Sequence, residues 1–253
     1  MYKHYFLLLL FVCASVAAMA CKCAPMRLAD NFQRAGFVAT AKIIDVTPDS
    51  LDSKYHDAEI EVINLYKGKS LKRIKIFSRG GSCYFLPKKQ TTWLIFATEF
   101  QGKLSFGFCS GSQHLDLFDP VKEPGLYKKY RSSNELKLEA VEYLKRHNVF
   151  SSSLGNIFTW NDQLPSINGF KAKQRIAVFQ IELATDFSVT AVKQLEKFGN
   201  AALDIAVLNS MRTNLKFSNT EKAYLDKPIS YLVVCYYYPG EDGRSSFISL
   251  YDG

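Results

Sequence analysis

Beyond residues 1–20, this sequence lacks long apolar runs, histidine clusters and glycine-rich phosphate loops. No later segment reaches the roughly 18 unbroken apolar residues that indicate a membrane-spanning helix. The His-Glu-x-x-His pattern of zinc peptidases is missing, and His56, His114 and His147 are isolated from one another. We therefore expect a protein that is not an enzyme and that holds no cofactor.

An arginine-rich block is also missing, although the formal net charge is +8. Lys and Arg are scattered along the chain, with short pairs such as Lys88-Lys89 and Lys128-Lys129. No stacking platform or recognition motif accompanies this charge, so we expect no nucleic-acid partner. Two interpretations of the basic surface remain open: ordinary solvation, or an orientation toward an anionic envelope or matrix.

The start of the chain has the three parts of a secretory signal peptide. Lys3 gives a short positive region, residues 5–18 are apolar apart from one serine, and Ala-Met-Ala at residues 18–20 places small side chains where signal peptidase requires them. The apolar stretch is shorter than the ~20 residues that cross a bilayer. We predict that residues 1–20 are a signal peptide and that the mature protein begins at Cys21, secreted or periplasmic within the cell envelope.

Two other fates of this segment remain open. One is an uncleaved anchor. The other is lipoprotein processing, because Cys21 directly follows the small Ala20, although Ala18 stands where such a signal usually has leucine. Lipidation at Cys21 is the only way in which we expect the mature chain to bind a membrane.

Cysteines predict how the first half is held together. One lies in the predicted signal, four lie between residues 21 and 109, and one lies near the end of the chain: Cys13, Cys21, Cys23, Cys83, Cys109 and Cys235. Four cysteines in an oxidising compartment allow three pairings. Cys21 and Cys23 are too close in an extended strand to bond readily to each other, so each is expected to bond to one of the distant pair. Cys235 lies in an apolar run and is expected to be a buried, inert thiol.

A second interpretation of Cys109 is a catalytic nucleophile. The sequence Gly-Phe-Cys-Ser-Gly at residues 107–111 is similar to a nucleophile elbow that carries cysteine. However, no helical pattern follows directly, and a disulfide partner is expected at this strand end. We therefore expect Cys109 to be structural.

The first half predicts a small barrel. Hydrophobic residues make up 47% of the chain and aromatic residues 14%, which favours packed strands. After a short helix near residues 28–34, five strands bounded by turn residues are predicted at 36–46, 58–66, 71–77, 91–97 and 103–108. Their regular spacing favours an antiparallel barrel of the OB-like kind. A helix over 133–147 follows, with an apolar stripe that can cover the barrel, formed by Leu136, Ala140, Val141 and Leu144.

The second half predicts a compact α+β unit. A serine-rich break at residues 151–153 opens a connector, and strands are predicted at 173–183, 189–197 and 228–238. Between the last two lies a helix over 201–213, whose buried face is expected to include Leu203, Val207 and Met211. The chain is thus divided into a signal at 1–20, a first domain at 21–148, a linker at 149–170 and a second domain at 171–253.

Residues 21–148 resemble the netrin-like domain of the tissue inhibitors of metalloproteinases. The likeness rests on the opening Cys21-Lys22-Cys23, on Cys83, on the strand around Trp93, and on Cys109, in order and rough spacing. It implies an OB-like barrel with flanking helices and the disulfides Cys21–Cys83 and Cys23–Cys109. The third barrel disulfide of that family has no counterpart here.

This resemblance implies a metalloendopeptidase inhibitor whose inhibitory wedge is Cys21, Lys22 and Cys23. In the family, the amine and the carbonyl of the first cysteine chelate the zinc of a target peptidase and displace its water. An α-amino group titrates near about 7.7–8.0, so a neutral amine is accessible at neutral pH. Lys22 stands where the family prefers a small or uncharged side chain for the specificity pocket of the peptidase. Lipidation of Cys21 would acylate the amine and abolish chelation.

Residues from about 165 to 240 resemble the C-terminal domain of TonB. The likeness rests on the runs at 175–181, 186–189 and 227–231, with the predicted helix between the last two. Phe187 stands where that domain usually has glycine in the turn. The resemblance implies a Gram-negative cell envelope and a partner protein that is bound by strand addition at a sheet edge. An envelope adaptor is therefore the alternative to a peptidase inhibitor.

Overall fold

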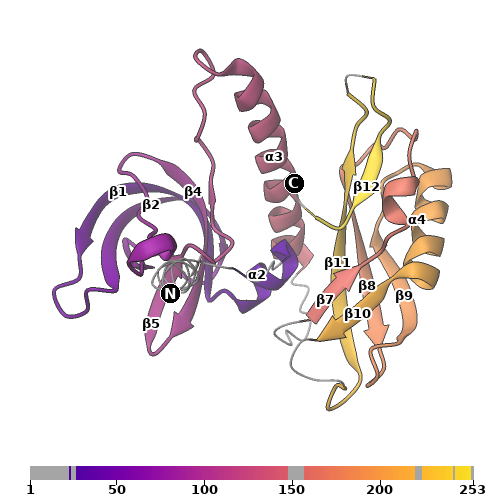
Figure 1. Cartoon of the computed structure of the whole chain (residues 1–253), viewed down its shortest axis with the longest axis horizontal. Coiled ribbons are helices and arrows are strands. Elements are labelled where there is room, and N and C mark those ends of the chain that lie inside the picture. The colour runs from indigo at the N-terminus through magenta and orange to yellow at the C-terminus, as the bar shows by residue number, and fades with distance from the viewer. Residues whose placement is uncertain (1–22, 24–26, 148–156, 220–223, 242, 252–253) are drawn as a thin grey trace, which may run out of the picture.

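The computed structural model describes residues 23, 27–147, 157–219, 224–241 and 243–251, which form two β-sheet units with two helices between them (Figure 1). The predicted signal peptide, Cys21 and Lys22 lie outside the described residues. Within the described ranges, no helix is long and apolar enough to span a bilayer.

The first unit is a closed five-stranded barrel, as the sequence predicted. Its strands run in the order β1-β2-β3-β5-β4, and β1 pairs with β4 to close the circle. β3 and β5 pair in parallel, so the predicted antiparallel pairing was wrong for these two strands, since strand spacing does not fix the direction of pairs that are not joined by a hairpin. The other neighbours are antiparallel, which is the OB-like arrangement. A short β6 (Gln113–His114) extends the sheet beside β4. The barrel strands are β1 (Phe37–Pro48), β2 (Tyr55–Lys67), β3 (Arg73–Phe77), β4 (Thr92–Phe100) and β5 (Lys103–Gly107).

Alternation along β1 shows how the barrel fills its interior. Phe37, Ala39 and Ile43 are buried in the barrel core, together with residues such as Phe106 of β5. Val38, one residue out of phase, instead joins a second apolar cluster outside the barrel. Successive side chains of a strand point to opposite faces, so β1 contributes to two cores at once.

Two helices flank the barrel. α2 (Leu28–Arg34) lies where the sequence predicted a helix. α3 (Pro124–His147) begins at Pro124, whereas the sequence predicted a start at residue 133. Proline is favoured in the first turn of a helix, and the first half of α3 lacks the apolar stripe from which helices are recognised in sequence. The predicted stripe from Leu136 to Leu144 is buried.

The second unit contains a four-stranded antiparallel sheet in the order β12-β11-β8-β9, with α4 (Ala201–Asn214) packed against it. The predicted order of strand, strand, helix and strand is present, whereas three short strands were not predicted, since runs of three or four residues carry little periodicity. One of them, β7, pairs with β10 and begins at Ile157, within the predicted linker. The strands are β7 (Ile157–Trp160), β8 (Ile176–Leu183), β9 (Val189–Glu196), β10 (Lys216–Asn219), β11 (Ile229–Tyr238) and β12 (Phe247–Ser249).

The turn between β8 and β9 explains Phe187. Its φ is 66°, in the left-handed region where glycine is favoured. The Asp186 carboxylate accepts hydrogen bonds from the Ser188 backbone N–H at 2.9 Å and from its hydroxyl at 2.6 Å. The Phe187 ring is buried in the core beneath α4. Its burial and the local hydrogen bonds offset a backbone strain of about 1–2 kcal/mol.

The four-stranded sheet is covered on both faces. On one face, Val233 and Cys235 of β11 join the core with α4, whose Leu203, Val207 and Met211 are fully buried as predicted. On the other face lies the second apolar cluster, which we call the shared cluster. It joins α2, α3 and the outer barrel surface to β8 and β11, with members that include Phe32, Val38, Leu136, Leu144, Val178, Leu232 and Val234. The apolar stripe of α3 therefore covers the sheet as well as the barrel.

Substitution of Leu144 tests whether the shared cluster couples the unfolding of the two halves. Leu144 is 0% exposed, and Leu144→Ala is expected to cost about 2–5 kcal/mol. Because the cluster belongs to both halves, unfolding of the barrel and of the second sheet should shift together. The 2 tryptophans separate the signals, since Trp93 lies in β4 and Trp160 in β7. Urea unfolding, followed by fluorescence in Trp93→Phe and Trp160→Phe backgrounds, measures each half.

The matched control is Leu126→Ala, which truncates a leucine of the same helix whose side chain is half exposed. It should leave both midpoints unchanged. Loss of stability in the barrel alone after Leu144→Ala would mean that the halves unfold independently.

Candidate functional site

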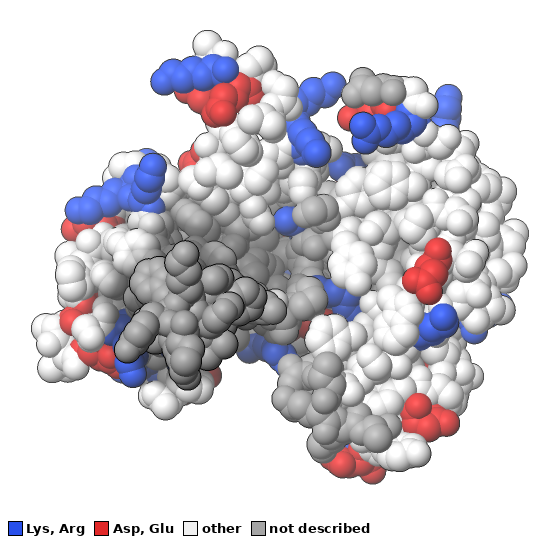
Figure 2. Space-filling view, viewed as in Figure 1, with Lys and Arg blue, Asp and Glu red and all other residues white. Residues whose placement is uncertain are grey.

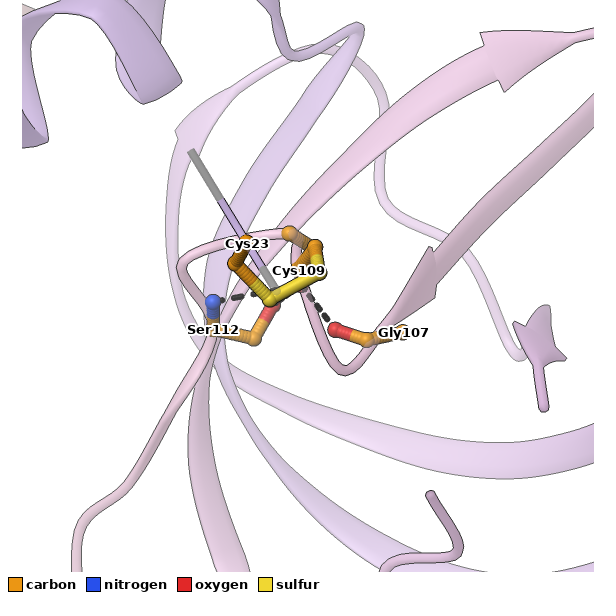
Figure 3. Close-up of a disulfide and its surroundings, with 5 residues drawn as sticks. Cys23, Gly107, Cys109 and Ser112 are labelled. Carbon is orange, nitrogen blue, oxygen red and sulfur yellow. Dashed lines mark hydrogen bonds between the residues drawn. A yellow bond between two sulfur atoms is a disulfide. The ribbon is translucent and has the colours of Figure 1, made fainter. Parts of the chain in front are cut away.

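A disulfide ties the N-terminal segment to the barrel. Cys23 and Cys109 are bonded, with Cα atoms 5.2 Å apart and a sequence separation of 86, which confirms this predicted pairing (Figure 3). Cys109 follows the end of β5, and both cysteines are exposed. Cys109 is therefore not available as a nucleophile, and the elbow-like sequence around it is a structural turn.

The other predicted disulfide involves residues beyond the described ranges. Cys83 lies in a 3-10 turn at Gly81–Cys83 and is disulfide-bonded. Its predicted partner Cys21, and Lys22 of the wedge, lie outside the described residues. The Cys21–Cys83 pairing and the role of Lys22 remain predictions.

The turn that carries Cys109 is stiffened by hydrogen bonds. Ser110 donates to the Gly107 carbonyl from its backbone N–H at 3.0 Å and from its hydroxyl at 2.8 Å. The Ser112 hydroxyl lies 2.8 Å from the Ser110 hydroxyl and accepts from the Phe96 backbone N–H at 2.9 Å. Phe96 belongs to β4, so the disulfide rests on a turn that is fixed to the barrel wall.

α2 packs directly on this turn. Gly111 has φ 75°, and a Cβ atom on it would lie 2.0 Å from Nδ2 of Asn31. Asn31 lies in α2 and is buried. Glycine is required here for both the backbone conformation and the close approach. The N-terminal segment is thus held against the barrel at Cys23 and again at Asn31.

The C-terminal end of α2 is also held by the barrel. Nζ of Lys67, the last residue of β2, donates to the Phe32 carbonyl at 3.0 Å and to the Gln33 carbonyl at 2.7 Å. These carbonyls lack partners within the helix, and a cation is favoured at this end of the helix dipole. Burial lowers the pKa of Lys67. Lys67 therefore fixes the end of α2 on the barrel.

The first turn of α2 contacts the second sheet. The Asp30 carboxylate accepts from the Tyr231 hydroxyl at 3.1 Å and from Nη2 of Arg27 at 3.2 Å. Burial raises the pKa of the Asp30 carboxyl, while the neighbouring Arg27 guanidinium acts in the opposite direction. No sequence pattern indicated this contact, because Tyr231 comes from β11.

Exposed aromatic side chains adjoin both barrel cysteines in sequence. Tyr84 follows Cys83 and is 60% exposed, and Phe108 precedes Cys109 and is 50% exposed. Phe85 holds the segment that carries Tyr84, because its ring packs edge-on against Trp93 with ring centroids 5.5 Å apart. Large exposed aromatic groups beside a fixed terminus provide contact area for a partner. Their position next to two cysteines is visible in the sequence, although it belongs to no recognised motif.

The remaining candidate residues do not form a metal centre in the described parts of the chain. No group of three His, Cys, Asp or Glu side chains there is arranged to hold a metal ion. His114 stacks on Trp93 with ring centroids 4.9 Å apart, and His147 stacks on Tyr143 at 4.3 Å. Cys235 is a buried free thiol, as predicted, and burial raises its pKa strongly.

An open cavity of about 280 Å³ lies between α3 and the segment that follows β6. Its walls are mainly apolar and include Leu115, Phe118, Tyr130 and Leu138. Arg131 at its edge is paired with Glu135, with 2.7 Å between Nε and Oε1. Cys23, the one described residue of the predicted wedge, does not line this cavity.

The surface charge is dispersed on the face drawn in Figure 2, where Lys and Arg alternate with Asp and Glu among large uncharged areas. No family model matches this chain, and no curated protein matches it. The candidate site therefore rests on the residues and geometry described above.

Gly111→Ala tests the contact between α2 and the disulfide turn. We expect it to destabilise the protein by more than the about 1–2 kcal/mol that a left-handed alanine costs alone. The matched control is Gly102→Ala, because Gly102 has φ 73° but open space where its Cβ atom would lie. Asn31→Ala in the Gly111→Ala background should restore the stability that Gly111→Ala loses beyond the loss in Gly102→Ala. Denaturant unfolding of the four proteins measures these effects, and equal losses at the two glycines would contradict a tight contact.

Asp30→Asn should alter stability in a pH-dependent way. Burial raises the folded-state pKa of Asp30 above its ordinary value of 3.8. The folded protein therefore retains a proton that the unfolded chain has released, so the contribution of Asp30 to stability is greatest below pH 3.8 and falls as pH rises through the folded pKa. Unfolding free energies of wild type and variant are measured from about pH 3 to 7. The stability of wild type relative to Asp30→Asn should fall as the pH rises across this range. A constant difference would contradict the raised pKa.

Proposed function

We propose that this protein inhibits zinc peptidases through its mature N-terminus, with the amine and carbonyl of Cys21 as ligands to the zinc of the target. The strongest support is the Cys23–Cys109 disulfide, which fixes the chain to an OB-like barrel just after the proposed ligand residue. The resemblance to the tissue inhibitors of metalloproteinases supplies the reaction, which is displacement of the zinc-bound water.

Rigidity is what the described residues contribute to this function. Ordering a free chain terminus on binding costs conformational entropy, and a terminus that is already fixed avoids much of that cost. Cys23 is fixed by Cys109, and α2 is fixed by Lys67 and by the close contact of Asn31 with Gly111. The terminus would therefore meet a peptidase with little freedom to lose.

The exposed Tyr84 and Phe108 extend the proposed contact surface. Aromatic side chains often dominate binding energy at protein interfaces because they bury large areas with few rotatable bonds. The Phe85 backbone N–H donates to the Ser78 hydroxyl at 2.9 Å, which holds the segment that carries Tyr84. We expect these two rings to pack on the rim of the peptidase cleft while Lys22 enters its specificity pocket. A long basic side chain suits a deep or acidic pocket.

One added residue ahead of Cys21 should abolish inhibition. The addition turns the amine into an amide, which is a poor metal ligand, and it pushes the terminus into the zinc site. Chains that begin at Cys21, with and without the extension, are assayed on a panel of zinc peptidases. The matched control carries one added residue after Gly253 and should inhibit as wild type does. Equal inhibition by the two N-terminal forms on every enzyme would contradict this mechanism.

Lys22→Ala should change which peptidases are inhibited while it leaves the mechanism intact. Loss of the cation should weaken inhibition of enzymes with acidic pockets by about tenfold and strengthen inhibition of those with apolar pockets. The same enzyme panel measures the change. An unchanged order of inhibition constants would mean that this side chain does not enter the pocket.

A second function, partner binding by strand addition, is favoured by the edge strand β9. Among the described strands, β9 pairs with β8 alone, so its other edge has backbone groups that no described strand bonds. By contrast, the outer edge of β11 is paired with β12 from Tyr236 to Tyr238. Extended peptides bind at such edges through main-chain hydrogen bonds. An envelope protein with an extended segment is the partner that this surface would accept.

Hydrogen exchange distinguishes this adaptor from the inhibitor. Addition of a solubilised envelope fraction should slow exchange of the β9 amides, because their free edge becomes paired. The β8 amides serve as the internal control, since β8 is already paired on both sides. Protection confined to α4 or to the barrel would exclude strand addition at β9.

A further inference from the structure

We propose that the second unit sets the direction in which the N-terminal segment leaves the barrel, and that Tyr231 is the positioning residue responsible. The inference rests on the proposed inhibitory function and deepens it, because it assigns the orientation of the wedge to a residue far from it in sequence. Figure 1 shows α2 between the barrel and the second sheet, where contacts from both units can reach it.

Tyr231 contacts two charged side chains at the start of α2. Its hydroxyl donates to the Asp30 carboxylate, 3.1 Å from Oδ1 and 3.2 Å from Oδ2, across a sequence separation of 201. The Arg27 guanidinium lies 4.6 Å from the centroid of the Tyr231 ring and bonds the same carboxylate at 3.2 Å. The three side chains form a closed network in which a rotation of α2 would break at least one contact.

The sheet side of this network is rigid. Tyr231 is 2% exposed, and Phe217 packs edge-on against its ring with centroids 5.4 Å apart. Tyr231 is the third residue of β11, which pairs with β8 from Ile229 to Tyr236. A ring held in this way cannot follow a small helix, so α2 must adopt the orientation that the ring imposes.

Two anchors therefore bracket the start of the described chain. Cys23 is bonded to the barrel through Cys109. Shortly afterwards, Asp30 accepts a hydrogen bond from Tyr231 of the sheet, and the Arg27 guanidinium lies over the Tyr231 ring. One anchor leaves a chain free to swivel about it. Two anchors on different units fix a direction as well as a position, which chelation of a recessed zinc requires.

Stability alone does not explain this arrangement. Buried ion pairs are commonly no more stabilising than apolar side chains of similar size, because charges lose hydration on burial. Within the described residues, the buried Nη1 of Arg27 has no hydrogen-bond partner. The apolar shared cluster already joins α2 to the sheet through residues such as Phe32 and Leu232. What the polar network adds is a defined geometry.

Tyr231→Phe tests the inference in the full mature chain. It keeps the ring and its contact with Arg27 but removes the bond to Asp30. Tyr237→Phe is the matched control, since that hydroxyl lies in the same strand and donates to the Phe170 carbonyl at 2.9 Å, away from α2. One readout is the hydrogen-exchange rate of the Asn31 backbone amide, which donates to the Arg27 carbonyl at 3.0 Å at the start of α2. The other is the inhibition constant for a sensitive zinc peptidase.

Tyr231→Phe should speed Asn31 exchange and weaken inhibition, each by about three- to tenfold, whereas Tyr237→Phe should change neither. In an Asp30→Ala background, Tyr231→Phe should have no added effect on either readout, because the acceptor of the tyrosine hydroxyl is already absent. Equal exchange in the two tyrosine variants would overturn the inference. So would faster exchange with an unchanged inhibition constant. If wild type inhibits no peptidase, the proposed function fails, while the exchange comparison still decides whether Tyr231 positions α2.

Discussion

Burial of both faces of the second sheet is the constraint on which the rest of the structure depends. β8 and β11 are apolar on each side, and α4 covers only one of them. The other face would present Val178, Leu232 and Val234 to water if α2 and α3 were not packed on it. Covering a side chain of this size contributes about 1.5–3 kcal/mol, so the sheet and the helices of the first half stabilise each other strongly. The two halves therefore share a core as well as a chain.

α2 is the element that turns this shared core into a site. It is short, and on its own a helix of this length is not stable in water. Its position is set by the units around it: Lys67 and Gly111 on the barrel side, and Tyr231 on the sheet side. A few residues before α2, the disulfide at Cys23 holds the chain to the same barrel.

Much of this architecture is predictable from the sequence because it depends on local periodicity. The alternation in β1, the stripe from Leu136 to Leu144 and the glycine-bounded strands give the barrel and most of the helices. The start of α3 at Pro124 was not predicted, since its first turns are exposed and have no apolar period. Phe187 illustrates a different point: its departure from glycine was visible in the sequence, but the burial that offsets the strain is a tertiary contact.

The site was less predictable than the fold. The four cysteines between residues 21 and 109 left the pairing open, and the resemblance to the tissue inhibitors of metalloproteinases implied the Cys23–Cys109 bond that the structure contains. The contact between Asp30 and Tyr231 leaves none, since one acid and one tyrosine are each common and nothing in their local sequence links them. Contacts of that kind arise from packing two units together, and single-sequence patterns report only on one element at a time.

The separation of 201 positions between Asp30 and Tyr231 also orders events during folding. The contact between α2 and Tyr231 cannot form until β11, near the end of the chain, has been synthesised. The loop that this contact closes is almost the whole protein. Such long-range contacts form late, because the chain loses conformational entropy before the contact contributes any stabilising free energy. α2 is therefore the first described helix to be synthesised, while its contact with Tyr231 is among the last to form. A chain that is cut short before β11 would keep Cys23, Cys109 and the barrel strands but would lack Tyr231, the partner of Asp30.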